Sequence, residues 1–215
     1  MTPQEIFSKE DHTLLSVTAT EEEFTKLAEE GIEAGAASIC VTPAAVPFLK
    51  QKFGDKIRIT TVIGFPNGYN TTAVKVAETE DAVKNGADEI DMVIAVGKAK
   101  EKDYDYLLRE IKAVRKAAEG KVLKVIVETC LLTEEEKIVL CKIVTEAGAD
   151  YIKTSTGFSK AGAQLEDILL FKKHIGKNVK IKAAGGIRTL EDAEKFIEAG
   201  ADRIGASAVI KGYLK

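Results

Sequence analysis

Two lysines in strand-like surroundings are the residues whose type and position first suggest chemistry. Lys153 lies in the middle of "YIKTSTGF" (151–158), and Lys182 lies in "KIKAAGG" (180–186). Burying a charged amine without a partner is costly, so its pKa falls until the amine is neutral, and a second cation nearby acts in the same direction. A neutral lysine amine attacks a carbonyl to form a Schiff base, whose protonated form draws electrons from the adjacent carbon. The pair therefore indicates an enzyme that makes or breaks a carbon–carbon bond.

Two carboxylates lie in similar strand-like runs and could move the protons of such a reaction. Asp91 lies in "EIDMV" and Glu128 lies in "VIVET". Each also has a structural interpretation, because Asp91 could cap a helix or form an ion pair and Glu128 could neutralise a lysine. We favour a catalytic role for Asp91 more than for Glu128. Lysines are usually solvated, and we interpret Lys124 and Lys180, which lie nearer the starts of their strands, as surface residues.

Metal chemistry and Ser–His–Asp hydrolysis find little support in the sequence. Its two histidines, His12 and His174, lie far apart. No pairing of Cys and His has the spacing of a zinc site, and there is no "GxSxG" elbow. The cysteines Cys40, Cys130 and Cys141 are widely spaced and odd in number, which is typical of reduced thiols in the cytosol. We expect a cytoplasmic protein without a metal site.

The composition predicts one soluble globular domain that spans residues 1–215. Of the 215 residues, 45% are hydrophobic and 30% are charged, which allows a substantial core. Two small domains would also fit this length, but no stretch has the composition of a linker. The net charge of −3 argues against nucleic acid or an anionic membrane as the main partner. No apolar run approaches the ~20 residues of a membrane span, and "MTPQEIFSKE" lacks the pattern of a signal segment.

Four similar segments recur at intervals of roughly fifty to sixty residues, about twice the length of one strand–helix unit of an α/β barrel. They are "EAGAAS", "KNGADE", "EAGADY" and "EAGADR". In each, Gly suits the left-handed conformation that ends a helix, and a β-type run begins shortly afterwards. The predicted strands span residues 11–15, 38–42, 58–65, 89–96, 123–129, 150–156, 180–186 and 202–207.

Eight strands joined by helices predict a parallel sheet, and eight repeated units close into a (β/α)8 TIM barrel more naturally than they form an open sheet. An open doubly wound sheet is the structural alternative, which a "GxGxxG" after the first strand would have favoured, and none is present. Helix starts with the spacing of a capping box support the helices between the strands. These starts are Thr20 with Glu23 and Thr133 with Glu136, and Thr189 with Asp192 is a near relative of the same motif.

In such a barrel the ligand binds at the carboxyl ends of the strands, and alternate side chains of each strand point inward. Glu128, Lys153 and Lys182 lie on three consecutive predicted strands, which are about 4.8 Å apart, so their side chains can converge. Glycine-bearing stretches follow the last two strands, "AAGGIRT" (183–189) and "RIGASAV" (203–209). Loops in these places often bind phosphate through backbone N–H groups, and "STGFSKAGA" could add a third wall.

The chain resembles the deoxyribose-phosphate aldolase family in five motifs, which follow the family's order over residues 11–207. They are "DHTLL", "DEIDMV", "LKVIVET", "YIKTSTGF" and "IKAAGGIR". The resemblance implies a (β/α)8 barrel, no metal and no organic cofactor. It implies the reversible cleavage of 2-deoxy-D-ribose 5-phosphate to D-glyceraldehyde 3-phosphate and acetaldehyde, in deoxynucleoside catabolism. It also implies that Lys153 forms the Schiff base, that Lys182 perturbs the pKa of Lys153, and that Asp91 shares the proton relay.

The resemblance further implies a set of substrate-binding residues. Asp11 and Thr13 would contact the substrate hydroxyls, and Cys40 would line the pocket. The remaining expected substrate and phosphate contacts are Thr156, Gly157, Gly185, Gly186, Gly205 and Ser207. Three positions depart from the usual family pattern, namely Thr42, Ala161 and Ala208, and none of them is a lysine of the site or Asp91.

Two alternatives stay open at the level of sequence. One is another phosphosugar barrel, such as an isomerase or a transaldolase-like Schiff-base enzyme, and the other is a sugar-phosphate-binding protein without turnover. The residues give Lys153 and Lys182 the same status, so the nucleophile is assigned by the resemblance alone. The expected partners are small phosphosugars and aldehydes, not nucleic acid or membrane, and a homo-oligomer is compatible with the sequence.

Overall fold

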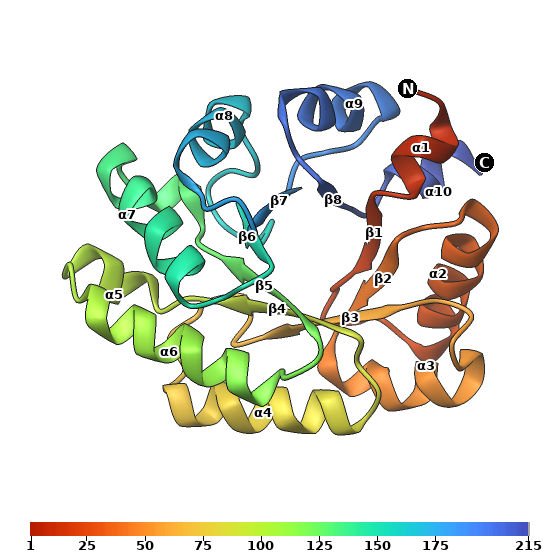
Figure 1. Ribbon diagram of the computed structural model, residues 1–215. Helices are drawn as coiled ribbons and strands as arrows, with labels where there is room; N and C mark the ends of the chain where they lie inside the picture. The colour runs from red at the N-terminus through yellow and green to blue at the C-terminus, as the bar shows by residue number, and fades with distance from the viewer. Residues whose placement is uncertain (215) are drawn as a thin grey trace.

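The computed structural model describes residues 1–214, in which eight parallel strands close into a barrel in chain order (Figure 1). Because β1 pairs with β8 as well as with β2, the sheet is closed, which confirms the predicted (β/α)8 TIM barrel and excludes the open doubly wound sheet. The strands are β1 (Glu10–Leu14), β2 (Ser38–Val41), β3 (Ile59–Ile63), β4 (Glu89–Val93), β5 (Val122–Ile126), β6 (Tyr151–Lys153), β7 (Lys180–Ala184) and β8 (Arg203–Ala206).

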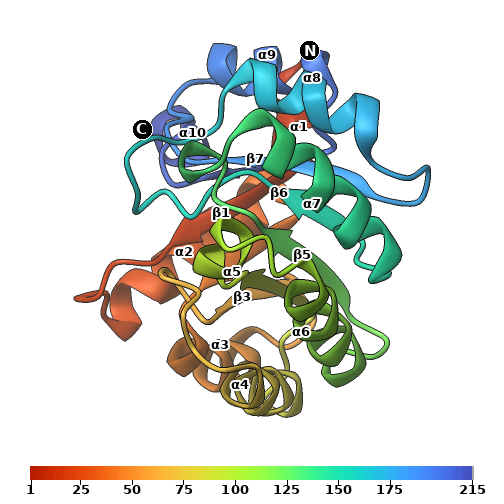
Figure 2. The same ribbon diagram turned by 90° about the vertical axis from the view of Figure 1, so that its left-hand side faces the viewer.

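Helices surround the strands on the outside of the barrel (Figures 1 and 2). They are α1 (Pro3–Phe7), α2 (Glu21–Ala34), α3 (Val46–Phe53), α4 (Thr72–Lys84), α5 (Val96–Lys100), α6 (Tyr104–Ala117), α7 (Glu134–Glu146), α8 (Leu165–His174), α9 (Leu190–Ala199) and α10 (Val209–Tyr213). Two short 3₁₀ turns, η1 (Pro43–Ala45) and η2 (Thr129–Leu131), follow β2 and β5.

The local signals in the sequence explain where helices begin and end. All three predicted capping boxes form, at the starts of α2, α7 and α9. A fourth, between Thr2 and Glu5, starts α1 and was not predicted. Gly35 and Gly148, in two of the repeated segments, adopt φ angles of 67° and 73° after α2 and α7. This left-handed conformation is strained for residues with a Cβ, so the repeated glycines turn the chain from each helix toward the next strand.

The hydrophobic core lies between the strands and the helices rather than inside the barrel. Outward-facing strand residues such as Ile39, Ile90 and Ile152 are fully buried in this layer. Alternate residues point inward and are largely polar or charged. The buried polar and charged side chains among them are Asp11, Ser38, Thr60, Glu89, Asp91, Lys124, Lys153, Lys182 and Arg203. The helix–strand layer therefore supplies most of the apolar burial, and the barrel interior is left for charged groups.

The strand that carries Lys153 is shorter than predicted, because β6 ends at Lys153 and not at Thr156. Thr154 leaves the strand but stays bound to β7, since its hydroxyl donates to the Ala184 carbonyl and its N–H donates to the Lys182 carbonyl. Thr154 thus holds the start of the following loop against the neighbouring strand.

Candidate active site

A cavity of about 530 Å³ opens at the carboxyl end of the barrel. The loops after β1, β6, β7 and β8 form its walls, and Lys153 is the one lysine on its surface among the described residues. Most of the predicted substrate-binding residues line it, namely Thr13, Thr156, Gly157, Gly185, Gly186, Gly205 and Ser207. A separate open hollow near Arg115 and Asp150 lies by the starts of β5 and β6, and neither Lys153 nor Lys182 lines it.

The two predicted catalytic lysines converge on one carboxylate oxygen. Lys153 Nζ and Lys182 Nζ each donate to Asp91 Oδ2 over 2.7 Å. The two nitrogens therefore lie within twice that distance of each other. Lys182 is completely buried and also donates to Asp11, whereas 3% of Lys153 is exposed, toward the cavity. Only Lys153 can meet a ligand in the cavity without displacing other groups.

The surroundings shift the pKa values of the two lysines in opposite directions. Burial lowers the pKa of Lys153. Attraction to Asp91 raises this pKa in part, and repulsion from Lys182 lowers it again. Burial also disfavours the charge of Lys182, but the carboxylates of Asp11 and Asp91 outweigh it and raise the pKa of Lys182. Lys153 is thus the amine that loses its proton more easily, and Lys182 is the cation beside it.

Six buried residues inside the barrel form a closed cycle of alternating charge, which we call the charge ring. Its members, in order of contact, are Asp11, Lys182, Asp91, Lys124, Glu89 and Arg203. Lys124 Nζ lies 2.8 Å from Asp91 Oδ1 and 2.6 Å from Glu89 Oε2. Arg203 closes the cycle, with Nη1 at 3.3 Å from Glu89 Oε2 and 2.5 Å from Asp11 Oδ1. Lys153 is attached to the ring through Asp91 alone.

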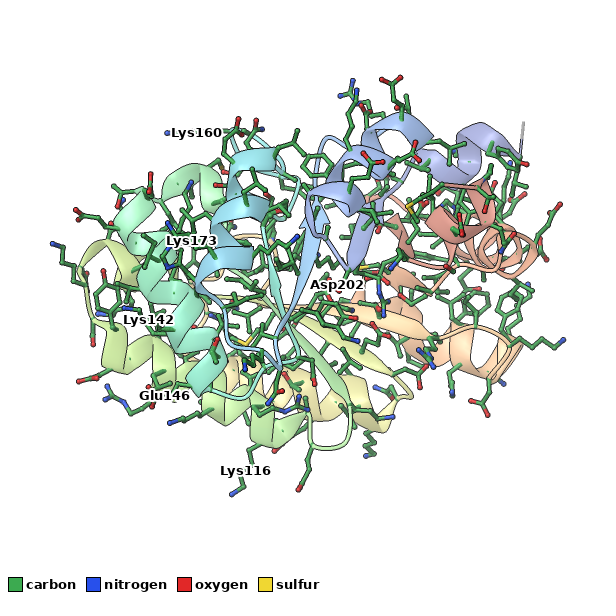
Figure 3. The ribbon with its side chains drawn as sticks, turned by 45° about the horizontal axis from the view of Figure 1, so that its top comes forward. Lys116, Lys142, Glu146, Lys160, Lys173 and Asp202 are labelled. Atoms are coloured by element: carbon green, nitrogen blue, oxygen red, sulfur yellow. The ribbon has the colours of Figure 1, made fainter. Side chains whose placement is uncertain are left out.

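The interpretation of Lys124 as a surface residue is wrong, while that of Lys180 is confirmed. Lys124 has no exposed surface, because it is the third residue of β5 and its side chain points into the barrel, where three carboxylates surround it. Surface lysines look different: Lys142 and Lys173 project outward from helices α7 and α8 (Figure 3). Attraction to Asp11, Asp91 and Glu89 outweighs burial and raises the pKa of Lys124.

Asp11 and Cys40 lie below the cavity and not on its surface. Both oxygens of Asp11 are occupied, since Oδ1 accepts hydrogen bonds from Ser38 and Arg203, and Oδ2 accepts one from Lys182. Cys40 is buried close to the lysines, and burial raises the pKa of its thiol. The predicted contacts of these two residues with substrate therefore stay predictions, and the structure adds for Asp11 a contact with Lys182.

Glu128 holds the loop that follows Lys153. Its carboxylate accepts hydrogen bonds from the backbone N–H and the hydroxyl of Thr156, the hydroxyl bond being 2.5 Å long. Glu128 adopts a left-handed backbone conformation with φ of 59°, which is strained for a residue with a Cβ. Burial raises the pKa of this carboxyl. The structural interpretation of Glu128 therefore has direct contacts in its favour, although the partner is a threonine and not a lysine.

The glycines around the cavity allow the loops after β6 and β7 to approach each other, and one of these glycines leaves space for the Lys182 side chain. Gly157 and Gly185 have φ angles of 84° and 86°, and a Cβ on Gly185 would lie 3.3 Å from Gly157 Cα. Gly205 has a second role, because a Cβ there would lie 3.1 Å from Lys182 Cε and 3.0 Å from Ala184 Cβ. Backbone N–H groups can approach an anion closely in such a glycine-lined wall.

The sequence analysis assigned no role in the site to Glu89, Lys124 or Arg203. One signal could have found two of them: Glu89 precedes Asp91 by two residues, and Arg203 precedes Gly205 by two, so each pair shares a face of its strand. Among residues 1–214, no group of three or more His, Cys, Asp or Glu side chains is arranged to hold a metal ion.

Comparison with known proteins identifies the family to which this geometry belongs. Residues 7–215 match the family described as DeoC/LacD family aldolase. The chain belongs to this family. It is 55% identical to a deoxyribose-phosphate aldolase of Clostridioides difficile over 94% of this chain and 92% of the relative. It is also 55% identical to one of Clostridium botulinum, over 100% of this chain and 97% of the relative.

A solved structure supports the same assignment. The deoxyribose phosphate aldolase from Aeropyrum pernix, described as a tetramer, superposes with a TM-score of 0.92 at 31% identity. The match covers 100% of this chain and 93% of that one. The resemblance drawn from the sequence motifs, and with it the prediction of a lyase of the aldolase class, is confirmed.

Proposed function

We propose that the chain catalyses the reversible cleavage of 2-deoxy-D-ribose 5-phosphate to D-glyceraldehyde 3-phosphate and acetaldehyde through a Schiff base on Lys153. The observation that carries this proposal is the Lys153 amine, which faces the cavity, has a lowered pKa and contacts Asp91. The curated relatives, at 55% identity over nearly their whole length, bear the name of this activity. A non-catalytic binder would have no use for two amines on one buried carboxylate.

The covalent steps follow from the chemistry of a neutral amine beside a cation. Lys153 Nζ attacks the C1 aldehyde of the open-chain sugar, and loss of water gives the protonated imine. The C3 hydroxyl then gives up its proton, the C2–C3 bond breaks, and its electron pair moves into the iminium to form an enamine. The C3–C5 fragment leaves as glyceraldehyde 3-phosphate. Protonation of the enamine at C2 and addition of water release acetaldehyde and return the free amine.

Asp91 and Lys182 are the groups placed to assist these steps. Asp91 contacts both amines, so its carboxylate can accept the proton that Lys153 releases and pass it on through Lys182 or water. The Lys182 ammonium disfavours a second positive charge nearby, which keeps Lys153 neutral before attack. Since Lys182 is fully buried and held by two carboxylates, it has no access to the carbonyl. This difference in access supports Lys153 as the nucleophile.

We propose that the phosphate binds against Gly186, Gly205 and Ser207. These residues line the cavity on the loops after β7 and β8, and nothing lies within 4 Å of the position of a Cβ on Gly186. Backbone N–H groups and one hydroxyl can hold a dianion there. The three departures Thr42, Ala161 and Ala208 lie outside the lysine–aspartate contacts.

The setting of the reaction is a proposal as well. The chain is an aldolase of small molecules, and no helix within residues 1–214 has both the length and the apolar character needed to cross a membrane. We propose that it acts in the cytoplasm, in keeping with its three free cysteines. We also propose a homo-oligomer, since the Aeropyrum pernix relative is described as a tetramer.

The test is to trap the Schiff base. The protein is incubated with acetaldehyde, reduced with borohydride and digested, and the modified lysine is located by mass spectrometry. We expect one adduct, on Lys153, and none on the exposed Lys160. The variant Lys153→Arg keeps the charge but cannot become a neutral nucleophile, so it should show neither adduct nor cleavage of deoxyribose 5-phosphate. Wild-type protein without an adduct on Lys153, or appreciable cleavage by Lys153→Arg, would refute the proposed mechanism.

A further inference from the structure

We propose that the charge ring sets the protonation of Lys153 through its total charge, with Lys124, Glu89 and Arg203 acting as positioning residues for the reaction. This inference rests on the proposed function, because it concerns the amine that forms the Schiff base. None of the three residues lines the cavity, so they act through Asp91 and Asp11 and do not touch the substrate.

The contacts within the ring show how the charge of Asp91 is divided. Lys124 occupies Asp91 Oδ1 at 2.8 Å, and Lys182 and Lys153 share Oδ2 at 2.7 Å each. One carboxylate therefore faces three amines. Burial would raise the pKa of Asp91, but the three cations outweigh it, Lys124 most of all, and hold the pKa well below its usual value. Asp91 is thus an ionised carboxylate whose attraction is shared among three amines, so any change in the charge of the ring changes the field at Lys153.

The ring has three acidic and three basic members and is neutral without Lys153. Asp11, Asp91, Lys124 and Lys182 have no exposed surface, and the other two members are also buried, so water screens these charges poorly. A proton on Lys153 would leave the barrel interior with one uncompensated positive charge. Loss of that proton leaves the interior neutral. The count of charges therefore favours the neutral, nucleophilic amine.

The other groups that face Lys153 are the same in all the variants compared below, so they do not contribute to a shift between variants. Glu128, after β5, is engaged by Thr156, and burial raises the pKa of its carboxyl. Cys40, on β2, has a raised thiol pKa because it is buried, so it is neutral. The polar groups that face the ring from β2 and β3, Ser38 and Thr60, are uncharged and hydrogen-bond each other. Asp91 and Lys182 are members of the ring.

Two single substitutions change the ring charge in opposite senses. Lys124→Met removes a cation and leaves the ring at −1, which favours the ammonium form of Lys153. Glu89→Gln removes an anion and leaves the ring at +1, which favours the neutral amine. The double variant Lys124→Met/Glu89→Gln is neutral again. Lys124 reaches Lys153 through Asp91, and Glu89 lies one contact further away. One unit charge at roughly 7 to 10 Å and an effective dielectric constant near 20 shifts a pKa by about one to two units.

The measurement is the rate of imine formation on Lys153 as a function of pH, with acetaldehyde and borohydride trapping followed by mass spectrometry. We expect the acidic limb of this profile to move up by one to two pH units in Lys124→Met and down by a similar amount in Glu89→Gln. At a pH on the limb, the rate should fall about 10- to 100-fold in the first variant. The double variant should return to the wild-type limb, even if its plateau is lower.

A matched control removes a buried lysine of another ion pair. Lys75 and Glu110 lie 2.8 Å apart, both without exposed surface, between helices α4 and α6 outside the barrel. Lys75→Met should leave the limb in place, whatever it does to the thermal midpoint. Because the double variant contains no uncompensated ring charge, it tests the proposal even if Lys124→Met alone folds poorly.

The outcomes separate this proposal from the proposed function. Wild-type protein without an imine on Lys153 would refute the function. If the imine forms on Lys153 but the limb stays fixed, moves the same way in both single variants, or fails to return in the double variant, the ring proposal alone is wrong. A shift in Lys75→Met would also overturn it, since the limb would then respond to any lost buried charge. Packing roles for Lys124 and Glu89 would lower the plateau without opposite shifts.

Discussion

Replacing Lys182 by methionine removes the cation nearest to the nucleophile while keeping the length of the side chain. Lys153 and Lys182 both bind Asp91 Oδ2 at 2.7 Å, so their nitrogens are about 5 Å apart at most. At an effective dielectric constant near 20, two unit charges at this distance repel by roughly 3 kcal/mol, which corresponds to about two pKa units. The variant also frees Asp11 and Asp91 to attract the Lys153 ammonium. Both effects raise the pKa of Lys153.

A raised pKa lowers the fraction of neutral amine at every pH below it. The wild-type pKa of Lys153 is lowered and the variant restores it toward its ordinary value, so the acidic limb of the rate profile should move to higher pH. We expect kcat/KM for deoxyribose 5-phosphate to fall about 100-fold on the limb and to recover in part at alkaline pH. The assay couples glyceraldehyde 3-phosphate formation to a dehydrogenase that works across the pH range.

The control for this experiment is Lys180→Met, on the same strand but exposed. It removes the same side-chain charge and should leave the profile unchanged. An acidic limb that stays in place in Lys182→Met, with a uniform loss of rate at all pH values, would refute the reasoning. Lys182 would then act in proton transfer or packing and would not set the pKa of Lys153.

Three further substitutions test other parts of the site. Asp91→Asn should reduce turnover by about 10²–10⁴-fold, because proton transfer is lost, while borohydride still traps an imine on Lys153, because the amine stays neutral. Loss of both turnover and imine trapping would mean that Asp91 holds the geometry of the site. Ser207→Asp should weaken binding of deoxyribose 5-phosphate by roughly tenfold to a few hundredfold, because a hydrogen bond to the charged phosphate worth about 1.5–3 kcal/mol is lost and the new carboxylate repels the phosphate. Binding of unphosphorylated deoxyribose should not change, and equal losses for both sugars would contradict the phosphate site. Gly205→Ala should lower kcat because its Cβ would lie 3.1 Å from Lys182 Cε, and a variant with unchanged kcat would show that Lys182 moves aside freely.

The sequence alone was sufficient for the architecture, because the architecture depends on local signals that repeat. Capping boxes at Thr20, Thr133 and Thr189 and left-handed glycines such as Gly35 mark helix ends without reference to distant residues. Eight alternating units then leave few arrangements other than a barrel. The positions of Lys153 and Lys182 on neighbouring strands follow from the same reasoning, since strand order matches chain order.

The pairing of charges inside the barrel required the tertiary structure. Lys124 looked like a surface residue because its compensating carboxylates, Asp11, Glu89 and Asp91, come from other strands. Burial of a charge is tolerable only with such partners, and the register that brings Asp91 beside Lys124 is a property of the closed sheet.

The difference between the two lysines was likewise decided in three dimensions. Both have the same residue type and similar local sequence, but Lys182 faces two carboxylates below the cavity, whereas Lys153 shares one of them and faces the cavity. A pKa depends on distances to charges and on depth of burial, which are sums over contacts from several strands. Sequence therefore placed the two lysines on neighbouring strands, and the folded barrel determined their charged partners and which amine is free to react.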